Sequence, residues 1–352
     1  MREIISPQNR PGRTGPQRGE GLQRCKGAYG SRMGRGRHAS HARHAQSGAA
    51  IITVMLVVAL VTVVVTALFW RSHITVRSVE NRLAMSQANW IQRVAIDWFR
   101  VMLMVDRRMP GALGNVDHLA EPWAAGLQPT EVNETVFAGA NITSREGRAA
   151  ILSGWADDAQ GRLNLTNLID DPNGVWLEAF KRLLVQTGQS ESLAVALRNR
   201  LRQSATRTVD GKPVTAQAGY YPFLRSRDLL RVPGFDPSVI AAIDLHVVFL
   251  PIATPVNLNT CKPEVLAAVL KDMDVGTARN FAGPQASRLY TTLADAQRAL
   301  NYRDPLPPEV FSVNSSFFIV NGVIRYERIE ALTQTLIQRQ GNKVEVIWQY
   351  RS

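Results

Sequence analysis

The sequence predicts an α+β fold in which a long N-terminal helix packs on a small antiparallel sheet and an all-helical domain is inserted between the sheet segments. Three observations predict this class. An uncharged apolar run spans residues 49–70, helical spacing of apolar residues dominates 171–305, and alternating apolar residues mark 306–352. The order of these segments places the helical domain between two parts of the chain that contribute strands.

Residues 1–48 are expected to form a basic leader. Ten lysines and arginines stand against two glutamates in the first 47 residues, which leaves +4 of the formal charge of +12 for the rest of the chain. A protein that coats nucleic acid is therefore not indicated. The leader cannot form a core, so we expect it to be disordered. A charged region directly before a long apolar run is typical of a targeting leader. The sequence leaves open whether translation starts at Met1 or Met33.

Residues 49–70 predict a membrane-spanning helix because they contain no charged residue. A helix of this length rises about 33 Å, which matches a hydrocarbon core of about 30 Å. The run exceeds the apolar region of a secretory signal, and no small-residue cleavage site follows it. We therefore expect the leader to be cut before the run, between Gly48 and Ala49.

Residues 71–109 predict an amphipathic continuation of the same helix, ending before Pro110-Gly111. Apolar side chains recur there at spacings of three, four or seven, with charged residues between them. This stripe consists of Val76, Val79, Leu83, Trp90, Val94, Trp98 and Met102. A plain single-pass anchor with a short stalk is the alternative interpretation.

Residues 110–170 predict a loop-rich connector followed by a β-hairpin. Two β-prone stretches within 151–168 flank a turn at Asp158-Ala159-Gln160-Gly161. We expect these two stretches to pair with each other.

Residues 171–305 predict the inserted helical domain. Leu193, Leu197 and Leu201 share one helix face, and Pro263 marks the first turn of another helix, with Asn259 or Thr260 as its cap. Two segments, around 229–243 and 263–282, combine helices with a tight Gly turn, as in helix-hairpin-helix or SAM-like units. Such units can bind DNA phosphates through backbone N–H groups. Few basic residues cluster beside them here, so nucleic-acid binding is not expected.

Residues 306–352 predict three antiparallel strands. The stretch Val313–Val320 runs into Asn321-Gly322, a strong hairpin signal, and Val323–Arg339 returns from it. A second turn at Gly341-Asn342 leads into a last strand of alternating apolar and polar residues.

The sequence contains no arrangement typical of a catalytic site, so we expect no enzymatic activity. The acidic pairs Asp157-Asp158 and Asp170-Asp171 are candidate Ca²⁺ ligands, because carboxylate oxygens suit this cation. Roles in turns and helix caps are the alternative for these residues. Cys261 is expected to be a small buried residue.

Four features together resemble the minor pseudopilin K family of type II secretion, whose members are pilin-like. They are the Gly48-Ala49 junction, the D-x-x-G-R-L-N-L run from Asp158, the V-N-L-N-T run from Val256, and the terminal sheet. Most pilins carry a Glu five residues after the cut, where this chain has Thr53, and this family commonly lacks that Glu. The resemblance covers about residues 46–352.

The resemblance implies a non-enzymatic subunit that caps the tip of a pseudopilus and helps to export folded proteins across the outer membrane. It implies a single-pass protein of the bacterial inner membrane with its C-terminal domain in the periplasm. The implied partners are minor pseudopilins I, J and H, the prepilin peptidase and the inner-membrane platform. The family includes Ca²⁺ binders. Two alternatives remain: a membrane-anchored DNA-binding protein of a competence-like system, and a minor pilin of a type IV pilus.

Overall fold

The computed structural model describes residues 47–107, 115–132, 149–205, 207–209, 212–214, 216, 221–282, 289–326 and 329–351. The predictions for leader residues 1–46 lie outside these ranges. The chain divides into two compact units, Met1–Trp70 and Arg71–Ser352, which are considered separately below.

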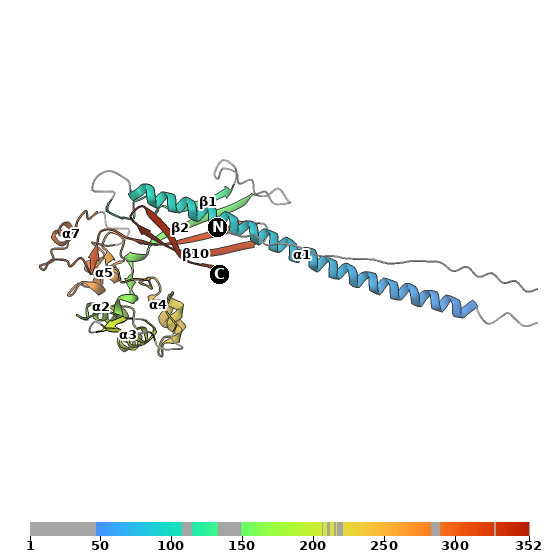
Figure 1. Cartoon of the computed structure of the whole chain (residues 1–352), viewed down its shortest axis with the longest axis horizontal. Helices are drawn as coiled ribbons and strands as arrows, with labels where there is room; N and C mark the ends of the chain where they lie inside the picture. Colours follow the sequence, from blue (N-terminus) through green and yellow to red (C-terminus); the bar gives the residue numbers. More distant parts are fainter. Residues whose placement is uncertain are drawn as a thin grey trace, which may run out of the picture. The chain divides into compact units, whose positions relative to one another are not determined.

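The first unit contains the start of α1, a helix that extends over Ser47–Arg107 (Figure 1). Its apolar part is long and uncharged enough to cross a membrane, and none of that part is buried by protein. Threonine hydroxyls in this stretch donate to the helix backbone: Thr62 to the Val58 carbonyl at 2.7 Å and Thr66 to the Thr62 carbonyl at 2.7 Å. Polar groups are thus satisfied within the helix, as a lipid environment requires.

The second unit is built around one five-stranded sheet with the order β1-β2-β9-β10-β11, in which every neighbouring pair is antiparallel. The strands are β1 (Leu127–Val132), β2 (Ala150–Asp158), β9 (Phe317–Tyr326), β10 (Ile329–Gln340) and β11 (Lys343–Arg351). The sheet therefore has two strands more than the three predicted at the C-terminus. The turn expected at Gly341-Asn342 is confirmed, because it separates β10 from β11.

The predicted hairpin within 151–168 is wrong. Strand β2 pairs with β1 and β9, whereas β3 (Leu163–Asn164) pairs in parallel with β6 (Val247–Val248). The intervening Ala159–Gly161 forms a 3₁₀ turn, η2, in which the Asp158 carboxylate accepts a hydrogen bond from Gln160 N. This turn directs the chain away from the sheet, so the two stretches do not meet.

The predicted turn at Asn321-Gly322 is also wrong, because both residues lie inside β9. Gly322 is needed there for close packing. A Cβ at Gly322 would lie 2.9 Å from Thr333 Oγ1, and one at its cross-strand partner Gly154 would lie 2.6 Å from the Asn321 carbonyl oxygen. A glycine is thus required at position 322, but the reason is crowding within the sheet and not a turn.

Residues 159–314 lie between β2 and β9 and are called the helical insert below; Figure 1 shows its helices gathered next to one end of the sheet. Its helices are α2 (Val175–Gln186), α3 (Ser192–Ser204), α4 (Pro237–Ile243), α5 (Pro263–Val269), α6 (Val275–Ala278) and α7 (Leu293–Ala299), with 3₁₀ turns η3 (Leu165–Leu168) and η4 (Ser226–Arg231). The predicted α+β class with an inserted helical domain is confirmed.

Short strand pairs supplement the helices of the insert. Strand β4 (Arg207–Val209) pairs with β5 (Lys212–Val214), and β7 (Val256–Asn257) pairs in parallel with β8 (Phe311–Ser312). The prolines at the starts of α4 and α5 fit the first helical turn, where no backbone donor is required. The predicted caps of α5 are wrong, since Lys262 occupies that position without a side-chain bond.

One continuous apolar cluster forms the core of the insert. It extends in sequence from Leu163 to Phe311 and includes the predicted leucine face of α3 and the fully buried Cys261. Burial raises the pKa of the Cys261 thiol to about 12, so this residue is an unreactive part of the core.

Candidate functional site

The side of α1 that packs on the sheet consists largely of small and medium-sized side chains. Ala84, Ala88 and Ile91 pack with Leu152 and Ile324 of the sheet. Further along, Ile96, Phe99 and Leu103 pack with Phe318, Ile337 and Val344. These residues recur at helical spacing and bury one complete face of the helix.

Most of the predicted apolar stripe lies on exposed surface of α1 and not against the sheet. Trp90 is 45% exposed, Trp98 48% and Leu83 55%. We call the exposed set the α1 stripe; it consists of Val76, Val79, Leu83, Trp90, Trp98, Val101 and Val105. Seven large apolar side chains at helical spacing form an apolar surface of the kind that marks a protein-interaction site.

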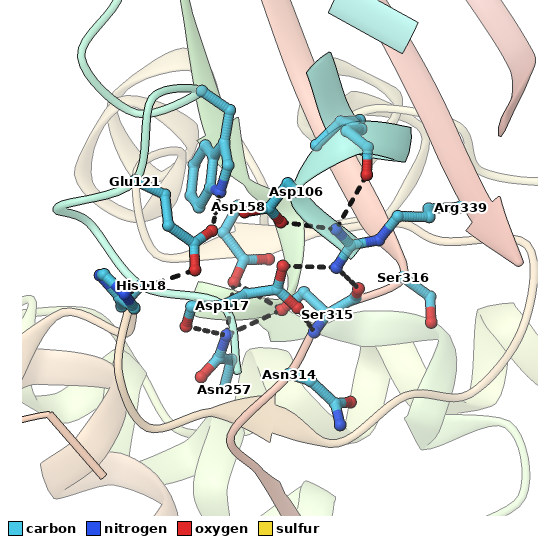
Figure 2. A network of polar contacts seen from close by, with 12 residues as sticks. Asp106, Asp117, His118, Glu121, Asp158, Asn257, Asn314, Ser315, Ser316 and Arg339 are labelled. Atoms are coloured by element: carbon cyan, nitrogen blue, oxygen red, sulfur yellow. Dashed lines mark hydrogen bonds and ion pairs between the residues drawn. The ribbon is translucent and has the colours of Figure 1, made fainter. Parts of the chain in front are cut away.

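A second feature is a network of buried polar side chains where α1, the sheet and the insert meet (Figure 2). We call it the acidic joint; its members are Asp106, Asp117, Glu121, Asp158, Asn257, Ser315 and Arg339. Asp106 lies in the last turn of α1, and Asp117 and Glu121 lie in the segment after it. Asp158 and Arg339 lie at the ends of β2 and β10, Asn257 lies in β7, and Ser315 lies just before β9.

Arg339 is the central cation of the acidic joint. Its guanidinium donates to Asp106 Oδ2 at 3.0 Å, to Asp117 Oδ1, and to the Ser315 carbonyl oxygen at 2.9 Å. The Arg339 side chain is only 3% exposed, and its charged group also lies 5.0 Å from the centre of the Phe318 ring. It therefore ties the end of α1 and the following segment to the sheet through charge-assisted hydrogen bonds.

Asp158 is the point where the insert attaches to the sheet. Its Oδ2 accepts hydrogen bonds from Ser315 Oγ at 2.5 Å, Thr260 Oγ1 at 2.6 Å and Asn257 Nδ2 at 2.9 Å. Asn257 Nδ2 also lies 3.1 Å from the Asp117 carbonyl oxygen. Burial raises the pKa of Asp158 to about 6, and these hydrogen bonds partly offset the effect.

Glu121 is the most perturbed acid of the joint. Burial raises its pKa to about 8, although the Trp123 indole donates to its Oε2. The other oxygen, Oε1, lies 3.5 Å from His118 Nε2. Burial and the nearby Asp117 charge also raise the pKa of Asp106. Burial is the main cause of all these raised values, and the neighbouring acidic charges add to it.

Within the described ranges, Asp106, Asp117 and Glu121 are the acids whose ligand atoms lie close enough together to hold a metal ion, within 4.8 Å of one another. All three are buried carboxylates and supply only oxygen ligands. Such ligands fit a hard cation such as Ca²⁺.

The four acids predicted from the sequence do not form one site with these three. Asp157 pairs with Arg162 at 3.2 Å, Asp158 belongs to the joint, and Asp171 accepts a hydrogen bond from the Leu177 amide at the start of α2. Asp170 is exposed. Their role as Ca²⁺ ligands stays a prediction.

At the cleavage junction, Gly48 and Ala49 lie at the start of α1, and Thr53 Oγ1 donates to the Ala50 carbonyl oxygen at 2.9 Å. Thr53 thus satisfies its hydroxyl within its own helix and carries no charge. Cleavage between Gly48 and Ala49 stays a prediction.

The helix-hairpin-helix pattern is present in the insert, with Gly234 at φ +90° between η4 and α4. Its phosphate-binding groups are already occupied. Asp236 Oδ1 accepts from the Ser238 and Val239 amides at 2.8 and 3.0 Å, and Asp274 Oδ1 accepts from the Thr277 amide at 3.0 Å. A carboxylate at each helix start would repel a DNA phosphate.

Comparisons with known proteins agree with this architecture, although no protein-family model matches the chain. The chain is 27% identical over 323 residues to type II secretion system protein K of Pseudomonas aeruginosa, which covers 86% of this chain and 92% of that protein. It is 23% identical over 326 residues to type II secretion system protein K of Pectobacterium carotovorum, covering 86% of this chain and 95% of that protein.

A chain in the crystal structure of the GspK-GspI-GspJ complex from the type 2 secretion system of enterotoxigenic Escherichia coli has a similar fold. The TM-score is 0.60 at 17% identity, and the match covers 78% of this chain and 99% of that chain. Both chains combine a long N-terminal helix, an antiparallel sheet and helical parts, which is the combination predicted from the sequence. The chain is therefore similar to type II secretion system protein K in sequence and in fold.

Proposed function

We propose that this protein is a non-enzymatic minor pseudopilin at the tip of a type II secretion pseudopilus, where it initiates or caps assembly. The α1 stripe is the observation that carries the proposal. Packing on the sheet leaves these side chains exposed although they are as large as core residues. A neighbouring apolar helix would bury them in the ridge-and-groove manner of helix pairs.

The proposed partners are the minor pseudopilins I and J, the proteins that accompany GspK in the matched crystal structure. Minor pseudopilin H and the inner-membrane platform would join the assembly, and prepilin peptidase would cut between Gly48 and Ala49. The helix from Ala49 onward would then anchor the protein in the inner membrane with residues 71–352 in the periplasm. The bulk of the insert would prevent another subunit from stacking above it.

Co-purification of the full chain with minor pseudopilins I and J tests the assembly. Trp98→Asp places a charge within the α1 stripe and should reduce recovery of the complex at least about tenfold, because a charge in an apolar interface is costly. Val185→Asp is the matched control, since Val185 is 59% exposed but lies on α2. Equal recovery of the Trp98→Asp and wild-type complexes would contradict the proposal.

N-terminal sequencing of the mature protein tests the predicted processing. The expected first residue is Ala49. A mature protein that retains Gly48, or that begins within the apolar run, would contradict the assignment.

We further propose that Asp106, Asp117 and Glu121 bind Ca²⁺ when the folded protein encounters it. Added Ca²⁺ should raise the melting temperature relative to chelator, because a ligand bound only to the folded state stabilises it. Glu121→Gln should remove this increase, whereas Asp170→Asn should not. If Asp170→Asn alone removes the increase, the ligands are those predicted from the sequence.

A further inference from the structure

The first helix-hairpin-helix unit contains a groove that the assembly described above does not use. One part, of about 210 Å³, lies between η4 and the sheet and is lined by Arg162, Arg225, Arg227 and Tyr350 among others. The next part, of about 410 Å³, lies between η4 and α4 and is lined by Leu230, Pro237, Ile240 and Ala241 among others. Ser226, Arg227 and Asp244 line both parts, so the two parts adjoin and are called the groove below.

The first part of the groove carries a surplus of positive charge. Three arginines line it against one aspartate, Asp244, which already interacts with the Ser226 hydroxyl. Arg162 is paired with Asp157, and Arg231, which lies just outside the groove, is paired with Asp228. Among the residues that the structure describes, Arg225 and Arg227 have no carboxylate partner, so two guanidinium groups remain available for an anion.

Arg225 is held in place by an aromatic side chain. Its guanidinium carbon lies 4.0 Å from the centre of the Tyr350 ring on β11. Stacking uses the face of the guanidinium and leaves the N–H groups at its edge free. An oriented guanidinium edge of this kind suits a carboxylate, which accepts two parallel hydrogen bonds.

Beyond the three residues that it shares with the first part, the second part of the groove is lined by apolar residues. Leu230 is 47% exposed there, and Leu224, which lines the charged part, is 52% exposed. A phosphate backbone would gain nothing from these side chains, and Asp236 occupies the amides at the start of α4. An acidic segment with apolar residues along one side would match both parts.

We infer that this groove binds an acidic, amphipathic peptide segment of another protein, with a carboxylate on Arg225 and apolar side chains over Leu230. The inference goes beyond the role of the α1 stripe, since the groove lies on the insert and on β11. It also gives the helix-hairpin-helix unit a role in which phosphate binding has no part.

Fluorescence anisotropy can test the groove with the full chain in non-ionic detergent and empty micelles as the blank. The probe is a labelled peptide in which glutamate and leucine alternate at helical spacing. We expect saturable binding that weakens with added salt. Arg225→Gln should weaken it about tenfold, because a charge-assisted pair is lost. Arg225→Lys should restore part of the affinity.

Three variants test whether the peptide binds in this groove and not elsewhere on the protein. Arg298→Gln removes an arginine that is 79% exposed on α7 and should leave binding unchanged. Arg227→Glu reverses a charge at an exposed position and should weaken binding at least as much as Arg225→Gln. Trp98→Asp should leave peptide binding unchanged even where it disrupts assembly, so the groove and the proposed function can fail independently.

Two further probes complete the test. A peptide with lysine in place of glutamate should not compete, and neither should duplex DNA. Equal binding of the basic peptide, displacement of the probe by DNA, no saturable binding of the acidic peptide, or an unchanged affinity of Arg225→Gln would each overturn the inference.

Discussion

The insert and the sheet are held together in different ways although they belong to one chain. The insert has a single continuous apolar core, from Leu163 to Phe311. The region around the sheet has three smaller apolar clusters and, where α1, sheet and insert meet, the buried acidic joint. Apolar contacts are non-directional, whereas hydrogen bonds and ion pairs need defined partners. The joint should therefore tolerate conservative substitution much less well than the insert.

Arg339→Met gives the largest expected effect. The change leaves Asp106 and Asp117 buried without their cation, and the loss of one partner of a buried ion pair costs about 3–5 kcal/mol. Urea unfolding followed by Trp fluorescence measures the loss. The control is Arg325→Met, since Arg325 and Glu330 form an ion pair with side chains 62% and 53% exposed. Losses of similar size in the two variants would contradict the comparison.

Asn257→Ala should give the next largest effect. Asn257 is fully buried, and its amide is shared among Asp158, Ser315 and the Asp117 carbonyl oxygen. Its removal leaves buried acceptors unpaired, which costs about 1–3 kcal/mol in the free energy of unfolding. Asn314→Ala, at an exposed position next to the joint, is the control and should change stability by less than about 0.5 kcal/mol.

Glu121, in the acidic joint, allows the comparison between the joint and the insert to be tested by changing the pH. Its pKa is raised by burial from 4.5 to about 8 in the folded state. Between these values the folded protein retains a proton that the unfolded chain has lost, so the free energy of unfolding falls as pH rises from about 4.5 to about 8. Melting temperatures in the presence of chelator should show this decrease.

Glu121→Gln provides the matched variant for the pH experiment. Glutamine retains an oxygen acceptor for the Trp123 indole but does not titrate, so the melting temperature should vary less across the same pH window. Glu330→Gln, at an exposed position on β10, should keep the wild-type slope. Identical slopes in wild type and Glu121→Gln would show that Glu121 is not the group responsible.

Leu197→Met gives the smallest expected effect and tests the insert. Leu197 is fully buried in the core, and a swap that conserves volume and apolar character costs less than about 1.5 kcal/mol. Thermal unfolding measures the change, and Leu197→Asn serves as the disruptive control. If Leu197→Met destabilised the protein as much as Arg339→Met, the proposed difference between the two regions would be lost.

Local sequence signals predicted the elements that depend on neighbouring residues. The helix over the apolar run and its amphipathic continuation, the start of α5 at Pro263 and the turn at Gly341-Asn342 all follow from periodicity, proline and glycine. The outcome differed where two causes give the same signal. A glycine such as Gly322 is favoured both in a turn and in a crowded strand, and the structure places it inside β9, where an added Cβ would lie 2.9 Å from Thr333 Oγ1.

The acidic joint could not be predicted because its partners are far apart in sequence. Arg339 lies 233 positions from Asp106 and 222 from Asp117, and no local pattern connects them. The α1 stripe was visible as a pattern, but its environment was not. Both the exposed set and the buried set, which includes Ala88, Ile91 and Phe99, repeat with helical spacing, so periodicity could not tell which of them faces the sheet.

The pairing of β2 with β9 has a consequence for how such a chain can be remodelled. The two strands are adjacent and antiparallel, and Asp158 and Phe318 are paired at the end where the insert leaves and returns. The helical insert therefore occupies the place that the turn of a simple β2-β9 hairpin would take. A short engineered loop from Asp158 to Ser315 could therefore delete the whole insert without changing strand order, while grafting at these two positions could transfer it to another sheet.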